Sequence, residues 1–334
     1  MNPESSPRKP FVLHASLGFL RTREAGIFLS LALIVAVILL MGEGPRESFL
    51  RHANLQNLSR QIALLAIFAI GETFVIIAGG IDLSVGSLIA FAGVLAGLLT
   101  VNLGMPAVLA IVIVLAASLG VGALHAVLIS RVGLQPFVAT LGTMCILRGV
   151  SLLLTDSLPI PIVDEGMTWL GNGRPAGIPT PALVLVLVAL IAMVILRNTI
   201  HGKYMIALGS NEEATRLSGI NVDRVKLLAY CLCSLLTGVA GVVFAGYARQ
   251  GNPSSGIAYE LNAIAASVIG GCSLTGGEGS VLGTLLGATI LSVILNGLNL
   301  VISKNASLWE GVIVGTVVIV AVGMNTIRRK ARRS

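Results

Sequence analysis

The chain has 334 residues, of which 55% are hydrophobic and 11% are charged. Soluble domains carry about 25% charged residues, so this composition excludes an ordinary soluble protein and is typical of one built for lipid. The formal net charge of +7 is better explained by the topology of membrane loops than by nucleic-acid binding.

The N-terminal segment 1–24 is basic and precedes a long apolar run. This order resembles a signal peptide, but the run Ala25–Met41 is long for a signal core and is followed by GEGPRE rather than by a small-residue cleavage site. We therefore predict a cytoplasmic N-terminal tail and an uncleaved first span.

Nine more apolar segments follow, and all ten should be helices. Lipid-exposed backbone must satisfy its own hydrogen bonds, and the sequence shows no alternating barrel pattern. We predict an all-α membrane protein, a polytopic bundle of about ten transmembrane helices over 25–326, followed by a basic cytoplasmic tail over 327–334. The eighth segment is short and could be a broken or tilted helix. The predicted spans are Ala25–Met41, Ile62–Ala78, Leu83–Val101, Ala107–Ile129, Pro136–Leu154, Pro181–Leu196, Leu227–Tyr247, Tyr259–Cys272, Val281–Ile302 and Trp309–Thr326.

The distribution of basic residues predicts the orientation. With the N-terminus in the cytoplasm, 15 Lys and Arg residues fall on that side and 6 on the other, while Arg148 lies inside a span. Because cytoplasmic loops carry the excess of positive charge, both termini should be cytoplasmic. The same rule places the long polar loop 197–226 in the cytoplasm and the Pro- and Gly-rich loop Thr155–Thr180 outside.

Two Gly-rich segments share one pattern. The stretches 75–93 (VIIAGGIDLSVGSLIAFAG) and 267–288 (SVIGGCSLTGGEGSVLGTLLGA) each read as an apolar run, a Gly pair, a short polar stretch, Gly-Ser and another apolar run. The similarity indicates an internal duplication, which is common in transporters. The alternative is that Gly-rich turns between helices resemble one another without common origin.

Few polar residues lie inside the predicted spans, and each is a candidate for the translocation path. Glu72 is deep in the second span without an obvious local partner. Asp82 precedes the third span and is also placed to cap it. Asn296 and Asn299 in the ninth span are most simply interhelical hydrogen-bonding residues.

Arg148 lies toward the outer half of the fifth span. A central Arg costs at least about 2.5–3.5 kcal/mol on insertion scales, so it should face a partner, a cavity or the interface. A role in the path is one interpretation, and snorkelling or pairing with Asp156 at the outer end of the span is the other.

The four cysteines lie in or beside apolar runs, and none has metal-ligand spacing. We expect Cys145, Cys231, Cys233 and Cys272 to be inert, buried thiols. His125 lies in a span and is expected to be a packing or hydrogen-bonding residue.

Several motifs are missing from the sequence. It holds no G-x-x-x-x-G-K-[ST] motif, because GGEGSVLG at 276–283 lacks the Lys. It shows no chain of intramembrane acids typical of a proton relay and no nucleophile–base constellation. We therefore expect no enzymatic activity, no metal and no cofactor bound by this chain.

Four stretches carry a resemblance to a known family. They are GGIDLSVGS (79–87), QPFVATLGTMCILRGVS (135–151), GKYMIALGSNEEATRLSGINVDRVK (202–226) and YELNAIAASVIGGCSLTGGEGSVLGTLLGA (259–288). In this order and spacing, the chain from about Ala53 resembles the permease subunits of bacterial ABC importers for monosaccharides, of the ribose, xylose and arabinose type.

The resemblance implies an ABC importer permease fold in the bacterial cytoplasmic (inner) membrane. It also implies three partners: a second permease copy, identical or a sister chain; a cytoplasmic ATPase that uses ATP and Mg; and an extracytoplasmic solute-binding protein. Two rival functions stay open. One is a secondary transporter driven by an ion gradient, and the other is the same ABC architecture carrying nucleosides, polyols or a furanone signal.

Importer permeases of this kind resemble one another in an E-A-A-x-x-x-G element, which here spans Glu213–Gly219 with Thr in place of the second Ala. Asn is a good N-cap, and acidic residues favour the first turn of a helix. We therefore predict a short docking helix that ends at a left-handed Gly and presents one apolar side chain. The alternative is a solvated loop that binds nothing, although about thirty residues is long for a connector. The predicted ATPase-docking residues are Asn211, Glu212, Glu213, Ala214, Thr215, Arg216, Leu217 and Gly219.

Aromatic residues make up only 4% of the chain. Sugars are usually held by stacked aromatic rings and polar networks, so this scarcity predicts a weakly binding passage, with selectivity mainly in the separate binding protein.

Overall fold

The computed structural model describes residues 23–302 and 306–331, and helices dominate this part of the chain. The predicted tail residues 1–22 and 332–334 lie outside the described residues. The elements are α2 (Arg23–Leu40), α3 (Glu43–Leu50), α4 (His52–Ile77), α5 (Val85–Gly97), the π-helix η1 (Leu98–Asn102), α6 (Ala107–Ser130), α7 (Pro136–Leu154), β1 (Ile160–Pro161), α8 (Glu165–Asn172), the 3-10 helix η2 (Pro175–Gly177), α9 (Thr180–Asn198), α10 (Ile200–Ser210), α11 (Glu212–Leu217), α12 (Val222–Ala248), β2 (Gln250–Gly251), α13 (Tyr259–Ile269), α14 (Val281–Val301) and α15 (Ala306–Ala331).

Each of the ten predicted spans corresponds to an apolar helix. Among the described residues, seven helices are long and apolar enough to cross a membrane, and three shorter apolar stretches lie in α2, α13 and α15. This confirms the prediction of a multi-pass, all-α bundle. The long spans are α4, α5 with η1, α6, α7, α9, α12 and α14.

Several helices begin earlier than predicted. The second span was expected from Ile62, but α4 begins at His52, and α12 begins at Val222 rather than Leu227. An apolar run in the sequence predicts only the part of a helix that lies in lipid. The polar turns before it hold the same helical hydrogen bonds but carry no hydrophobic signal.

The eighth span is a half-length helix. α13 has 11 residues, which is about 16 Å at 1.5 Å per residue and about half of a hydrocarbon core. α5 is also short, with 13 residues, and the π-helix η1 extends it to the length of a span. α5 follows one Gly-rich segment and α13 leads into the other.

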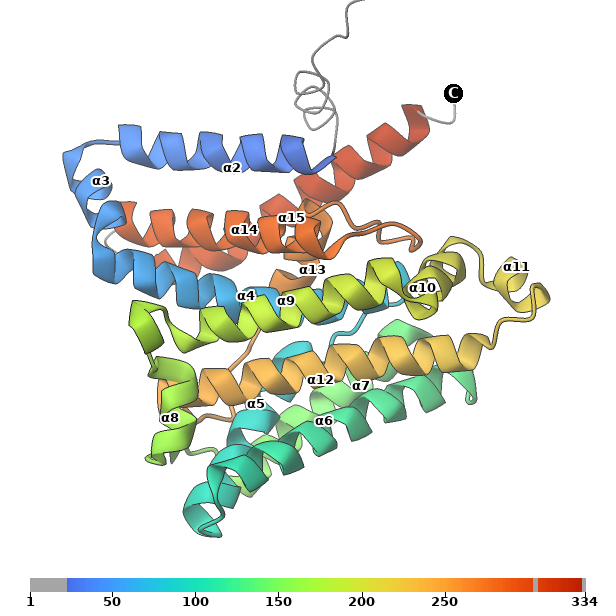
Figure 1. Cartoon of the computed structure of the whole chain (residues 1–334), viewed down its shortest axis with the longest axis horizontal. Helices are drawn as coiled ribbons and strands as arrows, with labels where there is room; N and C mark the ends of the chain where they lie inside the picture. Colours follow the sequence, from blue (N-terminus) through green and yellow to red (C-terminus); the bar gives the residue numbers. More distant parts are fainter. Residues whose placement is uncertain (1–22, 303–305, 332–334) are drawn as a thin grey trace, which may run out of the picture.

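α12 is the central helix, packed against α4, α5, α6 and α8. In Figure 1 the long helices run roughly side by side, with α11 projecting at one end of the array and α8 at the other. The loop Thr155–Thr180, predicted only as a connector, contains α8, and the antiparallel pair of β1 with β2 ties this loop to the segment after α12. Strands of two residues are too short to carry a periodic signal, so the sequence could not predict them.

Candidate functional site

The predicted docking loop is folded into two helices, α10 and α11. Asn211 caps α11, because its side-chain oxygen accepts a hydrogen bond from the Ala214 amide at 2.9 Å. Gly219 follows the helix with φ +81°, in the left-handed region that glycine tolerates best. The cap and the helix end therefore have the predicted geometry.

The side chains of α11 differ in burial and in their bonding partners. Thr215 is buried against its own chain, whereas Leu217 is 79% exposed. Glu212 forms ion pairs within the loop. Its Oε1 lies 2.8 Å from Lys226 Nζ on α12 and 3.2 Å from Arg216 Nη2. Glu213 is exposed, and its side chain forms no hydrogen bond or ion pair with any described residue. Among the described residues, Glu213 is thus the acid of α11 without a partner, and Leu217 is its exposed apolar side chain.

The charge of Glu212 is stabilised by its basic neighbours. Partial burial raises the pKa of this carboxyl, but hydrogen bonds and charges from Lys226 and Arg216 outweigh burial and hold the pKa below its usual value. Ionised Glu212 therefore tethers α11 to α12.

α10 connects the docking helix to both Gly-rich segments. Gly209, near the end of α10, lies so close to the Ile77 carbonyl oxygen and the Gly277 amide that a Cβ atom there would collide with both. The Gly277 amide also donates a hydrogen bond to the Ile77 carbonyl at 2.9 Å. The two segments that resemble each other in sequence therefore meet beneath α10. Their common origin stays a prediction.

A buried hydroxyl cluster joins the same elements deeper in the bundle. Thr73 Oγ1 on α4 lies 2.7 Å from Thr284 Oγ1 on α14 and 3.1 Å from Ser267 Oγ on α13. Hydrogen bonds of this kind stabilise helix–helix packing in lipid, where alternative partners are scarce.

The two intramembrane acids lie in the core rather than in a described pocket. Glu72 is fully buried, and its Oε1 accepts a hydrogen bond from the Asp82 amide at 3.1 Å. The prediction that Asp82 caps the next helix is wrong, because the N-cap is Ser84 and no side-chain cap is present. Asp82 instead accepts hydrogen bonds from the Ser84 amide and hydroxyl at 2.8 and 2.7 Å, closing its own turn.

The other carboxylate oxygen of Asp82 faces His125 of α6. Oδ2 lies 3.4 Å from His125 Nδ1, and both side chains are almost fully buried. The atoms are within ion-pair range but do not meet hydrogen-bond geometry. Tyr230 of α12 packs edge-on against the imidazole, with ring centroids 5.8 Å apart. His125 is therefore part of a buried polar cluster that joins α6, α12 and the turn before α5.

Arg148 has a different partner from the one expected. Pairing with Asp156 is wrong, because the Arg148 guanidinium donates hydrogen bonds to the backbone carbonyls of Pro253 and Ser255. These carbonyls belong to the loop between β2 and α13, which is far away in sequence. Arg148 fixes this loop against α7.

The two asparagines of α14 differ in role. Asn296 exchanges two side-chain hydrogen bonds with Asn54 of α4, at 3.0 and 3.1 Å, which confirms an interhelical bond. Asn299 is exposed and bonds only to the Leu295 carbonyl of its own helix among the described residues, so the interhelical prediction is wrong for it.

Burial of the cysteines was also predicted incorrectly for two of the four. Cys233 and Cys272 are buried, but Cys145 is exposed and Cys231 is partly exposed in the single chain. A residue in an apolar run can face lipid as well as the protein core, and the run itself does not distinguish the two.

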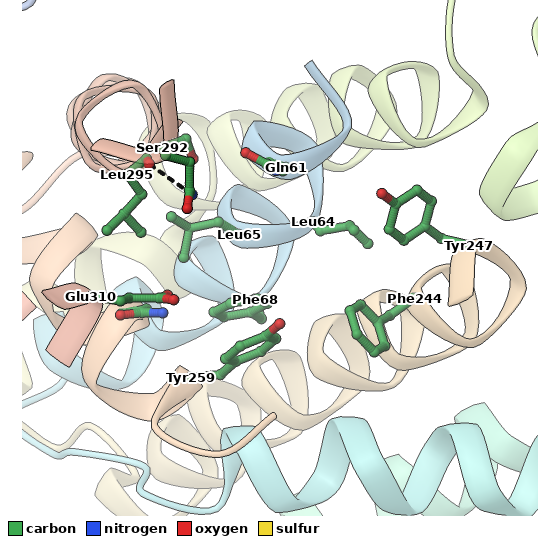
Figure 2. Close-up of a pocket in the computed structure, with 12 residues that line it drawn as sticks. Gln61, Leu64, Leu65, Phe68, Phe244, Tyr247, Tyr259, Ser292, Leu295 and Glu310 are labelled. Atoms are coloured by element: carbon green, nitrogen blue, oxygen red, sulfur yellow. Dashed lines mark hydrogen bonds between the residues drawn. The ribbon is translucent and has the colours of Figure 1, made fainter. Parts of the chain in front are cut away.

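A cavity of about 270 Å³ lies between α4, α12, α13, α14 and α15, and we call it the aromatic pocket. Figure 2 shows Phe68 beside Tyr259, with Phe244 next to Tyr259 and Glu310 on the other side of Phe68. Asn299 is the one predicted path residue that lines it. The full lining is Gln61, Leu64, Leu65, Phe68, Phe244, Tyr247, Tyr259, Asn262, Ser292, Leu295, Asn299 and Glu310.

Sequence reasoning missed this pocket because its residues come from five separate helices. Each of these aromatic and polar residues is isolated within an apolar or mixed stretch, and no short motif joins them. A partial signal was present in the helices themselves, since polar side chains such as Asn262 and Ser292 are costly in lipid unless they face a partner or a cavity.

Comparison with known proteins gives a consistent set of relatives. Residues 54–322 match the family described as branched-chain amino acid transport system / permease component. The ribose import permease protein RbsC of Escherichia coli strain K12 is 41% identical over 299 residues, covering 87% of this chain and 91% of the relative. RbsC of Bacillus subtilis strain 168 is 39% identical, with 90% and 92% covered. The xylose transport system permease protein XylH of E. coli K12 is 30% identical, with 93% and 94% covered.

Proposed function

This chain belongs to the family of branched-chain amino acid transport system permease components, and from that premise we propose that it is the membrane-spanning subunit of an ATP-driven monosaccharide importer. It is a multi-pass protein of the bacterial inner membrane. The family description names amino acids, whereas the relatives at 30–41% identity carry the names of ribose and xylose permeases. The relatives match nearly the whole chain, so they are the better guide to its substrate.

The observation that carries the proposal is the contact chain from α11 to the Gly-rich segments. α11 offers Glu213 and Leu217 to a cytoplasmic ATPase, and α10 packs through Gly209 against the turns that follow α4 and α13. Movement of the docking loop is therefore transmitted directly to the turn before α5 and to the turn after the half-length helix α13. ATP and Mg are used by the ATPase, and this chain contributes the path.

Two further partners complete the machine. A second copy of the chain, or a sister permease, forms the other half of the pore, and an extracytoplasmic binding protein delivers the sugar. The RbsC relatives are named ribose import permeases, which supports delivery from outside.

The test is reconstitution in proteoliposomes of the chain with the ATPase and binding protein encoded beside it. We expect uptake of ribose or xylose that requires ATP and all components, with leucine as the comparison solute. ATP-independent uptake by this chain alone, driven by an ion gradient, would show that it is a secondary transporter. ATP-dependent uptake of leucine without sugar would support the wording of the family description instead.

The N-cap of α11 provides a graded prediction. Asn211→Ala removes the hydrogen bond to Ala214, which costs about 1 kcal/mol, and should weaken ATPase binding about fivefold. Asn211→Ser keeps a capping oxygen and serves as the matched control. Affinity is measured by titrating detergent-solubilised permease with labelled ATPase. Equal affinities for the two variants would mean that the folded α11 is not what the ATPase binds.

A further inference from the structure

The geometry points to the aromatic pocket as the site where one monosaccharide ring binds during its passage through the permease. This inference rests on the proposed function, because it names the place within the path where the imported sugar is held.

The pocket extends from the middle of the bundle toward the end opposite the docking helix. It is lined by Gln61 to Phe68 from the middle of α4, by Phe244 and Tyr247 at the end of α12, and by Ser292 to Asn299 from the second half of α14. In Figure 1 these helix ends point away from α11. With α11 in the cytoplasm, the pocket therefore lies in the outer half of the membrane, where an imported solute arrives first.

Aromatic rings form one wall. Phe68 and Tyr259 are stacked with centroids 5.8 Å apart and planes inclined by 12°. Phe244 meets Tyr259 edge-on at 6.1 Å. The faces of aromatic rings carry negative charge density, which suits the slightly positive C–H groups on the flat face of a sugar ring. A chain with few aromatics thus places four of them, including Tyr247, around one cavity.

The polar groups of the pocket lack partners within the described chain. Asn262 is 8% exposed and Ser292 is 4% exposed, yet neither side chain forms a hydrogen bond with any described residue. Gln61 and Glu310 also line the pocket and have no such bond. Asn262 and Ser292 are buried, and buried polar groups are nearly always paired, so these two side chains are available to bond a molecule that occupies the pocket. Gln61 is exposed and Glu310 is half-buried, so both can bond water when the pocket is empty. A ligand with several hydroxyls supplies donors and acceptors together.

Charge and size narrow the class of ligand. The lining contains one carboxylate, Glu310, and no Lys or Arg, so it gives an anion such as a sugar phosphate no counter-charge. A lipid tail would leave the amides and the hydroxyl unpaired. The volume of about 270 Å³ is near the lower limit of roughly 300 Å³ for small-molecule sites, which suits a single neutral sugar ring.

Protection of an introduced thiol tests the site directly. Leu64 lines the pocket without a polar role, so Leu64→Cys is placed in the complex of permease and ATPase with Cys145 and Cys231 changed to Ser. A small water-soluble methanethiosulfonate labels the thiol with or without D-ribose or D-xylose, in the absence of binding protein. The fraction of unoccupied pockets falls by a factor of one plus the ratio of sugar concentration to Kd. A sugar concentration of ten times Kd should therefore slow labelling about tenfold.

The controls use the same chain. Val163→Cys, in the loop before α8 and outside the pocket lining, is 79% exposed in the native chain and should be labelled at one rate with or without sugar. Asn262→Ala or Tyr259→Leu should abolish protection of Leu64→Cys, whereas Tyr259→Phe should keep it. If Leu64→Cys is not folded, Asn299→Cys at the exposed part of the lining replaces it.

The outcomes separate the pocket from the proposed function. Suppose that the wild-type complex imports ribose or xylose with ATP, but sugar does not change the labelling of either pocket thiol. This result overturns sugar binding in the aromatic pocket and leaves the importer function unaffected. Protection that survives Asn262→Ala and Tyr259→Leu also overturns it. Failure of the wild-type assembly to import any monosaccharide overturns the proposed function instead.

Discussion

Glu213→Lys should abolish binding of the ATPase while the permease still inserts and folds. Glu213 lies in the first turn of α11, is exposed and has no partner among the described residues. An acid in this position is expected to meet a basic group on the ATPase, and like-charge contacts across an interface cost several kcal/mol. A loss of about 3 kcal/mol would weaken association more than 100-fold. Deletion of 211–219 should have the same effect.

The matched control is Glu165→Lys. Glu165 is also an exposed acid in the first turn of a short capped helix, α8, at the opposite end of the molecule. Co-purification of ATPase from membranes, together with size-exclusion profiles of the permease, gives both readouts. Full co-purification with the 211–219 deletion would show that the docking assignment is wrong. Loss with Glu165→Lys as well would indicate a general effect of charge rather than a docking contact.

Asp82→Ala should have the largest effect on folding. It removes the acceptor for the Ser84 amide and hydroxyl and leaves His125 buried without the carboxylate that faces it. Leaving a buried hydrogen-bonding group without its partner costs about 1–3 kcal/mol, so the loss of two hydrogen bonds from Ser84 removes a large part of the roughly 5–15 kcal/mol stability of a folded protein. We expect a strong fall in folded yield and in melting temperature in detergent.

Companion variants separate the contributions to this effect. Asp82→Asn keeps one acceptor for Ser84 and should be less destabilising. Asp82→Ala combined with His125→Leu should be milder than the sum of the single changes, because the two groups share one interaction. Asp223→Ala, at an exposed acid on α12, is the control and should leave the melting temperature unchanged. If Asp82→Ala abolished transport but left the melting temperature unchanged, the result would support a role for Asp82 in the translocation path.

The docking loop was the most predictable part of the site. Cap, acidic first turn and terminal Gly are local signals within nine residues, and the structure has the predicted geometry for Asn211 and Gly219. What the sequence could not resolve was the division between the two neighbouring acids. Glu212 forms an ion pair with Lys226, 14 positions away. The side chain of Glu213 has no ion-pair partner among the described residues.

Residues inside the membrane were harder to predict because their partners are distant. The position of Arg148 favoured nearby Asp156, yet its partners are the carbonyls of Pro253 and Ser255. The pattern around Asp82 favoured a cap, yet the residue closes its own turn and faces His125. In each case the expected neighbour was the nearest one along the chain, whereas packing of the helices decided the actual one.

The sequence by itself determined that this is a multi-pass helical membrane protein, with its spans in order, a folded polar loop and a family. These follow from hydrophobicity, capping and local order along the chain, all of which are readable within about 20–30 residues. Only the tertiary structure decided that the two Gly-rich turns meet beneath α10 and that a few scattered aromatic and amide residues converge on one pocket. The physical reason is that lipid selects for apolar surface almost everywhere, so the rare polar contacts are specified by which helices touch.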